Sequence, residues 1–156
     1  MNLNSTIHVS GLSLRAKSTS MRISIIRTGH FNAAHRLYLP DWSDEKNTEV
    51  FGKCANPNFH GHNYHFEVKV SGEVDPRTGM LMNLKDLKAI IVQYVEDKFD
   101  HRNLNTEFEE FKTMTSTAEN LCYVIWTILR ERLDDKYDIH VRLWETPRNS
   151  VEYPAS

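Results

Sequence analysis

Apolar and polar residues alternate along several stretches of the chain. The alternation is cleanest over residues 62–72, where Tyr64, Phe66, Val68 and Val70 share one face and polar side chains share the other. A period of two residues is typical of β-strands that bury one face. The pattern, or a run of β-branched residues, predicts strands over residues 22–28, 31–37, 62–72 and 140–146 and a short extended tail over 151–153.

Two later segments instead repeat apolar residues every three or four positions, which is typical of amphipathic helices. The first begins after Asn83, a residue that favours the N-cap position, and runs to about Lys98. The second opens with Ser116-Thr-Ala-Glu119, a capping box with Ser116 as the N-cap and Glu119 at the third helical position.

Three segments follow neither period. Residues 40–58 and 100–115 are polar, and the first of them is predicted to be a long loop. Residues 75–79 (DPRTG) predict a turn, because Pro fixes φ and Gly accepts a positive φ, and residues 80–82 would be the return strand of a hairpin. Strands, then helices, then strands, without βαβ alternation, predict an α+β fold with an antiparallel sheet covered on one face by two helices.

The composition describes an ordinary globular domain. The 156 residues are 40% hydrophobic and 26% charged, which is enough to bury one core. The net charge of −2 gives no electrostatic reason to expect nucleic acid or a membrane surface as partner. Cys54 lies in a polar segment and Cys122 in an apolar helical pattern, so we expect no disulfide between them and a reducing, cytoplasmic setting.

Residues 1–20 differ from the rest of the chain. They are rich in Ser and Thr, contain no Asp or Glu, and carry Arg15 and Lys17. Organelle transit peptides have this composition, and so do disordered tails that precede a folded domain. We expect a disordered leader over residues 1–20 and one folded domain over residues 21–156.

Three of the eight histidines fall within six residues, in the segment NPNFHGHNYHF (residues 56–66). His60 and His62 are two apart on a predicted strand and share a face, whereas His65 has the opposite parity. Catalytic zinc typically takes three protein ligands, and His35, on a neighbouring predicted strand among apolar residues, is the candidate for the third. Each histidine alone could be a surface or core residue. Together they predict a metal site, for which zinc is favoured, although imidazole also suits iron, copper and nickel.

Cys54 has two possible tasks beside these histidines. It could be a fourth ligand, which would make the site a structural one. Alternatively, it could be a reactive thiol whose pKa is lowered by Lys53 or by another nearby cation. Cys122 needs no such explanation, because packing in the core accounts for it.

Two acidic residues complete the set of candidates. Asp100 directly precedes His101 after the first helix, so the pair could form a proton relay or compensate the negative end of the helix dipole. Glu145 has the strand parity of Val141 and Leu143 and should point to the apolar side. A carboxylate there needs a cation or a pair of N–H donors, such as the edge of a 2-aminopyrimidinone ring. The alternative is a frayed strand end with Glu145 in solvent.

In their order and spacing these motifs resemble the 6-pyruvoyltetrahydropterin synthase family, which includes the 6-carboxytetrahydropterin synthases of the queuosine pathway. The resemblance covers about residues 22–153, and the Cys-x5-His-Gly-His element is its most specific part. The segments that carry it are FNAAHRL (31–37), CANPNFHGHNY (54–64), GEVDPRTG (72–79), FDHRNL (99–104), STAEN (116–120) and Glu145-Thr.

The resemblance implies an assembly and a set of roles. The fold would be the tunnelling fold, a four-stranded antiparallel sheet with two helices on one side, in trimers that stack into a homohexamer with active sites at subunit interfaces. Ala118 stands where some relatives have Thr. The implied roles are His35, His60 and His62 as ligands of Zn²⁺, Cys54 as catalytic thiol, Asp100 and His101 as proton relay, Glu145 as anchor of the pterin ring, and Thr117 and Glu119 as further substrate contacts.

The implied activity is that of a zinc-dependent lyase, which converts 7,8-dihydroneopterin triphosphate to 6-pyruvoyltetrahydropterin and eliminates triphosphate. The carboxy branch would take the same substrate but break a side-chain carbon–carbon bond and release acetaldehyde. The Cys-x5-His spacing and the STAEN segment resemble the pyruvoyl branch, because a shorter Cys-x3-His form is familiar in the queuosine pathway. A non-catalytic protein that keeps the zinc and binds a pterin is a third alternative.

Overall fold

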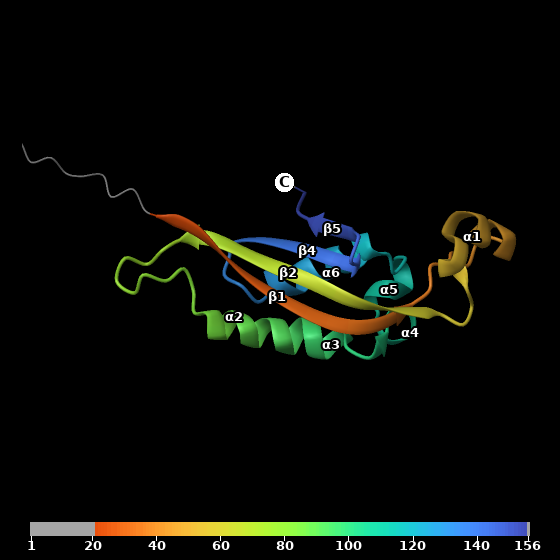
Figure 1. Cartoon of the computed structure of the whole chain (residues 1–156), viewed down its shortest axis with the longest axis horizontal. Helices are drawn as coiled ribbons and strands as arrows, with labels where there is room; N and C mark the ends of the chain where they lie inside the picture. Colours follow the sequence, from red (N-terminus) through yellow and green to blue (C-terminus); the bar gives the residue numbers. More distant parts are fainter. Residues whose placement is uncertain (1–20, 156) are drawn as a thin grey trace, which may run out of the picture.

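A five-stranded sheet of order β3-β1-β2-β4-β5 forms the centre of the computed structural model, which describes residues 21–155 (Figure 1). Neighbouring strands pair antiparallel, except that β1 and β3 pair parallel. The strands are β1 (Arg22–His35), β2 (His60–Glu73), β3 (Arg102–Asn103), β4 (Asp138–Thr146) and β5 (Asn149–Tyr153). The α+β class is confirmed, and the two-residue β3 is the strand beyond the four expected. The leader expected over residues 1–20 lies outside the described residues.

Two strand predictions differ from the structure. The separate strands predicted over residues 22–28 and 31–37 form one continuous strand, β1, which ends at His35. The return strand predicted over residues 80–82 is wrong, because only one bridge, between Asp75 and Met80, closes the turn. The hairpin cannot extend further, since the N-cap Asn83 begins a helix three residues later.

The loop predicted over residues 40–58 is also wrong in part, because it contains α1 (Asp44–Phe51) and the 3₁₀-helix η1 (Gly52–Ala55). Ser43 caps α1 by accepting a hydrogen bond from the Lys46 N–H at 3.2 Å. The helix buries a single residue, Asn47, so it has no apolar stripe that a periodicity argument could detect. Its position at one end of the sheet, where β1 ends and β2 begins, is clear in Figure 1.

Both long helices are present. The first continues through α2 (Leu84–Ile91), the π-helical turn η2 (Val92–Glu96) and α3 (Asp97–Phe99), with Asn83 as N-cap, as predicted. The second is α6 (Ala118–Arg130), but its N-cap is Thr117 and not Ser116, because the Thr117 side chain accepts the Asn120 N–H. The polar segment before it holds the short helices α4 (Leu104–Glu107) and α5 (Glu110–Thr113). Among residues 21–155, no helix is long and apolar enough to cross a membrane.

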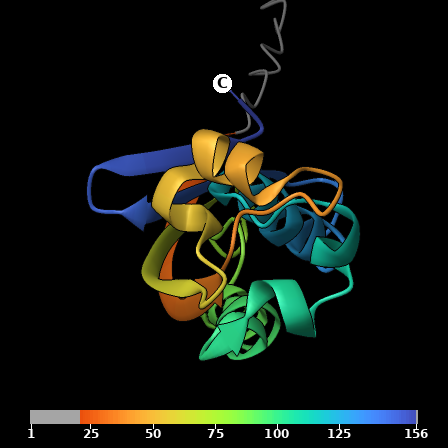
Figure 2. The same ribbon diagram turned by 90° about the vertical axis from the view of Figure 1, so that its right-hand side faces the viewer.

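The two long helices cover the same face of the sheet, as the end-on view in Figure 2 shows. The core lies between them and the strand residues of one parity. From β2 these are Tyr64, Phe66, Val68 and Val70, the residues whose alternation predicted the strand. Within residues 21–155 neither long helix covers the opposite face of the sheet, which carries the polar residues of the same strands.

The free edge of β1 is capped by carboxylates near its end. Glu96, in η2, accepts a hydrogen bond from the His30 N–H at 3.2 Å, and Asp100, just after α3, accepts one from the Asn32 N–H at 2.8 Å. Strand β3 then pairs with Ala33 and Ala34. Since exposed edge N–H groups require partners, this arrangement fixes where the chain places Asp100 and its neighbour His101.

Gly29 is required by close packing in this region, and Gly29→Ala is expected to lower the free energy of unfolding by about 1–3 kcal/mol. A Cβ atom there would lie 2.4 Å from Phe66 Cζ and 2.6 Å from Glu96 Oε1. The matched control is Gly61→Ala in β2, whose added Cβ would meet its nearest neighbour at 3.4 Å. Urea unfolding of both variants checks the prediction, which is wrong if Gly29→Ala is no less stable than Gly61→Ala.

Candidate active site

The register of β1 and β2 brings three histidines together at one end of the sheet. His35 is paired directly with His60, and Ala33 with His62, so the three imidazoles project from the helix-covered face. Each offers a ring nitrogen, and these atoms all lie within 4.8 Å of one another. His65, by contrast, is exposed on the other face, as its parity predicted. The sequence prediction of the cluster is confirmed by this geometry.

The cluster has the chemistry of a metal site. Nδ1 of His35 donates to the Ser116 carbonyl at 2.7 Å, which leaves the Nε2 lone pair of this fully buried ring free. Nε2 of His35, His60 and His62 is in each case buried without a hydrogen-bond partner among the described residues. Burial lowers the pKa of His35 to about 4, against the raising effect of the Ser116 carbonyl, and burial also lowers the pKa of His60. Neutral imidazoles with converging lone pairs fit a zinc ion. A hydrogen bond from the second ring nitrogen, like the one from His35 to Ser116, typically fixes the orientation of a zinc-binding histidine.

Cys54 belongs to η1, which the structure ties to the end of β1 through a hydrogen bond from the Leu37 N–H to the Cys54 carbonyl at 2.9 Å. Its thiol is free and partly buried. Burial, and next the negative charge of Glu145, raise the pKa of the Cys54 thiol. The lowering expected from Lys53 is therefore not found in the chain. The charge of Glu145, which faces the histidine cluster, therefore acts on the Cys54 thiol.

Glu145 lies at the end of β4 and faces the histidines. Its Oε1 is 3.5 Å from His35 Nε2 and 3.6 Å from His62 Nε2. The predicted orientation toward the apolar side is confirmed, and the alternative of a frayed strand end in solvent is wrong. Glu145 also lines a pocket of about 630 Å³ together with Thr117, Ala118 and Glu119. The structure thus brings all three predicted substrate contacts to one cavity beside the histidines.

Asp100 and His101 form the predicted pair. The Asp100 Oδ2 atom is 2.7 Å from His101 Nδ1, and Oδ1 accepts hydrogen bonds from the Asn32 N–H and side-chain amide. The backbone N–H of Asn32, followed by the hydrogen bond to His101, lowers the pKa of Asp100. His101 adopts a positive φ of 57° and donates its own N–H to the Asn32 carbonyl.

The Asp100–His101 pair belongs to the other face of the sheet. Asp100 accepts a hydrogen bond from the Asn32 side chain, and Asn32 has the strand parity opposite to that of His35. His101 lines an open pocket of about 430 Å³ with residues of that parity, Asn32, Ala34, Gly61 and Asn63, and Ala33 and His62 also line it. Among residues 21–155, no hydrogen bond, ion pair or ring contact joins His101 to the three clustered histidines.

Two residues of the site were not predicted. Tyr64 follows His62 at the same parity, its ring lies 5.6 Å from that of His62, and its buried hydroxyl has no hydrogen-bond partner among the described residues. Its place in the row after His60 and His62 is a signal that could have identified it. Arg148 brings a positive charge to the Glu145 pocket from the turn between β4 and β5. A single arginine in a polar turn gives no such signal.

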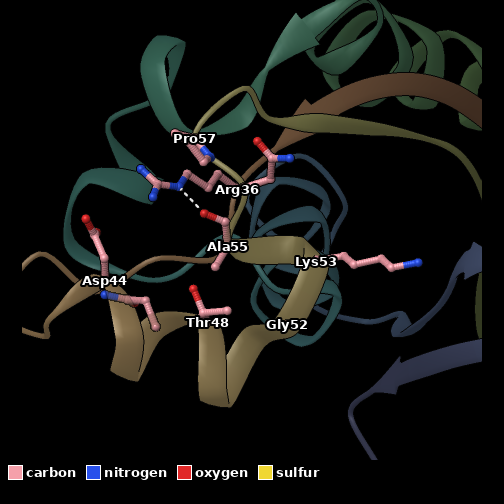
Figure 3. Close-up of a pocket in the computed structure, with 9 residues that line it drawn as sticks. Arg36, Asp44, Thr48, Gly52, Lys53, Ala55 and Pro57 are labelled. Atoms are coloured by element: carbon pink, nitrogen blue, oxygen red, sulfur yellow. Dashed lines mark hydrogen bonds between the residues drawn. The ribbon is translucent and has the colours of Figure 1, made fainter.

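A further pocket of about 620 Å³ lies between α1, η1 and the end of β1 (Figure 3). Arg36 donates from Nε to the Ala55 carbonyl at 2.7 Å, and its guanidinium lies 4.0 Å from the Tyr38 ring centre. In Figure 3 the Lys53 side chain points away from Arg36, so the two cations do not converge on a common ligand. Arg36 therefore holds the η1 segment in place rather than marking an anion site.

The fold and the site define an α+β domain in which three histidines that could hold a metal ion lie beside a pocket lined by Glu119 and Glu145. The family model described as 6-pyruvoyl tetrahydropterin synthase matches residues 24–156. The chain belongs to the 6-pyruvoyl tetrahydropterin synthase family, as the sequence motifs indicated.

Named relatives agree with this placement. The chain is 46% identical over 123 residues to the 6-pyruvoyl tetrahydrobiopterin synthase of Homo sapiens, covering 79% of this chain and 85% of that protein. The solved structure of Caenorhabditis elegans 6-pyruvoyl tetrahydropterin synthase superimposes with a TM-score of 0.81 at 40% identity, covering 88% of this chain and 98% of the other. The 6-carboxy-5,6,7,8-tetrahydropterin synthase of Haemophilus influenzae is 28% identical over 123 residues, covering 65% of this chain and 84% of that protein.

Proposed function

We propose that the protein is a zinc-dependent lyase that converts 7,8-dihydroneopterin triphosphate to 6-pyruvoyltetrahydropterin with elimination of triphosphate. The observation that carries the proposal is the cluster of His35, His60 and His62 beside Cys54 and Glu145, in a chain 46% identical to the human synthase. The free cysteines also fit a cytoplasmic enzyme.

In this proposal the three histidines would hold a zinc ion through their ring nitrogens. When bound, zinc supplies Lewis-acid polarisation of the hydroxyl groups on the substrate side chain. Cys54 would accept a proton from a side-chain carbon as the thiolate, and the positive charge of a bound zinc ion would oppose the raised pKa of its thiol. His101, oriented by its bond to Asp100, exchanges protons on the opposite side of the substrate, which is ordinary acid–base catalysis. Triphosphate leaves as the double bonds rearrange.

The position of Glu145 refines the expected contacts to the pterin ring. Its carboxylate is 3.5 Å from a histidine of the cluster, and therefore lies at the end of the pocket that would hold the hydroxylated side chain. The 2-aminopyrimidinone edge is at the opposite end of the bicyclic ring. Glu119 lines the same pocket, so we propose that Glu119 accepts the two N–H groups of this edge and that Thr117 supports it.

The location of the relay supports an oligomeric enzyme. Asp100 is held by Asn32, whose side chain is on the sheet face away from the histidine cluster, and the His101 side chain is 79% exposed. A relay in bulk water contributes little, because water itself exchanges protons there. We therefore propose that His101 serves the site of a neighbouring subunit, in a homohexamer built from two trimers.

Incubation of the zinc-loaded protein with 7,8-dihydroneopterin triphosphate tests the proposed reaction. The expected products are triphosphate and 6-pyruvoyltetrahydropterin, identified by mass spectrometry after anaerobic work-up. The lower identity to the Haemophilus influenzae carboxy enzyme than to the human pyruvoyl enzyme favours this outcome. Acetaldehyde and a 6-carboxypterin would assign the protein to the carboxy branch, and an unchanged substrate would reject both.

A further inference from the structure

Glu145 makes a contact with the histidine cluster that is not a hydrogen bond. Its Oε1 lies 3.5 Å from His35 Nε2 and 3.6 Å from His62 Nε2, beyond the 2.7–3.2 Å range of N–H···O bonds. The tautomer of His35 explains why. Its Nδ1 donates to the Ser116 carbonyl, so in the neutral ring Nε2 carries a lone pair and has no proton to offer the carboxylate.

An ionised carboxylate oxygen that faces an imidazole lone pair, as Glu145 faces Nε2 of His35, is repelled by it unless a cation lies between. Zinc bonds to imidazole nitrogen and carboxylate oxygen are 2.0–2.2 Å long, so two ligand atoms on one tetrahedral ion are about 3.3–3.5 Å apart. The two contacts of Glu145 have nearly this spacing. They are what two imidazoles and a carboxylate show when they share one metal ion.

We propose that Glu145 is the fourth ligand of the zinc ion in the substrate-free protein, and that the substrate displaces it. The inference rests on the proposed zinc site. Among the described residues, the close histidine contacts of this carboxylate are with His35 and His62. The same carboxylate lines the pocket that also contains Glu119, which is where a substrate would enter.

In the absence of substrate, the Glu145 carboxylate would occupy the fourth coordination position of the zinc ion. Catalytic zinc sites keep one position for water or substrate. A carboxylate on a strand end, 24% exposed, can leave that position by rotating its side chain without moving β4. Once displaced, it remains next to the bound side-chain hydroxyls as a hydrogen-bond acceptor. The negative charge also partly neutralises the ion while no substrate is present.

Zinc affinity of the substrate-free protein, measured by competition with a chromophoric chelator, tests the proposal. Glu145→Gln keeps the size of the side chain and removes its charge, and is expected to weaken zinc binding at least ~10-fold. Glu119→Gln is the matched control, because it lines the same pocket without contacting the histidines, and should change the affinity less than ~2-fold. Metal-free unfolding curves of the two variants show whether either one fails to fold.

A second measurement reads the ligand set directly. Cobalt-substituted protein should change its visible absorption on Glu145→Gln, and a non-reactive dihydropterin diol should remove that difference between the variant and the parent. Zinc affinity and cobalt spectra that are unaltered by Glu145→Gln would overturn the proposal. Cys54→Ala tests whether the fourth zinc ligand is the Cys54 sulfur. Loss of zinc in Cys54→Ala, with zinc retained in Glu145→Gln, would assign the fourth position to sulfur. Since neither readout requires turnover, a protein that binds zinc through Glu145 but fails to convert the pterin triphosphate would reject only the proposed function.

Discussion

Replacing Cys54 with alanine is expected to lower kcat for 7,8-dihydroneopterin triphosphate at least ~10²-fold, the low end of what a positioned acid–base group contributes. The expectation follows from the position of the thiol. It is partly buried in η1, where burial and next the charge of Glu145 raise its pKa, and the Cys54 carbonyl accepts the N–H of Leu37, two residues after the end of β1. A sulfur held there can take a proton from a substrate bound at the three histidines.

Zinc content and unfolding midpoint are measured alongside turnover, because they separate the two tasks considered for Cys54, catalytic thiol and zinc ligand, from a non-catalytic protein. The proposed function expects both to stay at the parental values while activity is lost. A variant that loses zinc or fails to fold would show a structural four-ligand site, since such sites contribute folding energy outright. Activity close to that of the parent would favour a non-catalytic pterin-binding protein or a different base.

The second cysteine supplies the matched control. Cys122 is 1% exposed in α6 and packs in the core, where burial raises the pKa of its thiol to about 12. Cys122→Ala removes a buried sulfur and should lower stability by about 1–2 kcal/mol without changing kcat of the folded enzyme. If both variants lose activity to the same extent, the loss reflects the fold and not the chemistry of residue 54.

Much of the fold could be predicted because burial imposes a period. Strand β2 buries every second residue, and the long helices carry apolar stripes, so both kinds of element were visible in the sequence. Helix α1 has no such stripe, and it depends on the Ser43 cap and on contacts with its surroundings. Contacts with the surroundings also explain why the N-cap of α6 is Thr117 and not Ser116. Ser116 is fully buried, and its carbonyl accepts a hydrogen bond from His35.

The histidine cluster was predictable for the same reason, since strand parity decides which histidines share a face. Strand parity does not predict how far a side chain on another strand or in a connecting segment lies from the histidines. Glu145 was correctly oriented, but its distance from the histidines depends on the register of β4 against β2. His101 depends on a left-handed backbone, a π-helical turn and a two-residue strand, none of which has a sequence period.

Mixing two inactive variants is expected to restore activity if His101 serves a neighbouring subunit. His101→Ala, like Cys54→Ala, should lower kcat at least ~10²-fold when it is the only chain present. In a homo-oligomer assembled at random from equal amounts of both, a site that takes Cys54 from one chain and His101 from another is intact in about a quarter of cases. Activity should therefore recover to about a quarter of the parental value.

The two chains can be co-expressed with different tags, and mixed oligomers isolated by capturing both tags in sequence. Cys54→Ala mixed with a Cys54→Ala/His101→Ala double variant is the control, because no arrangement of these chains gives an intact site. Mixed oligomers without recovered activity would place His101 and Cys54 of the same chain in one site. That result would require His101 to reach across β1 and β2, although Asp100 and Asn32 hold it on the opposite face. Recovery would instead explain why the chain builds a well-ordered relay at a place where, alone, it faces solvent.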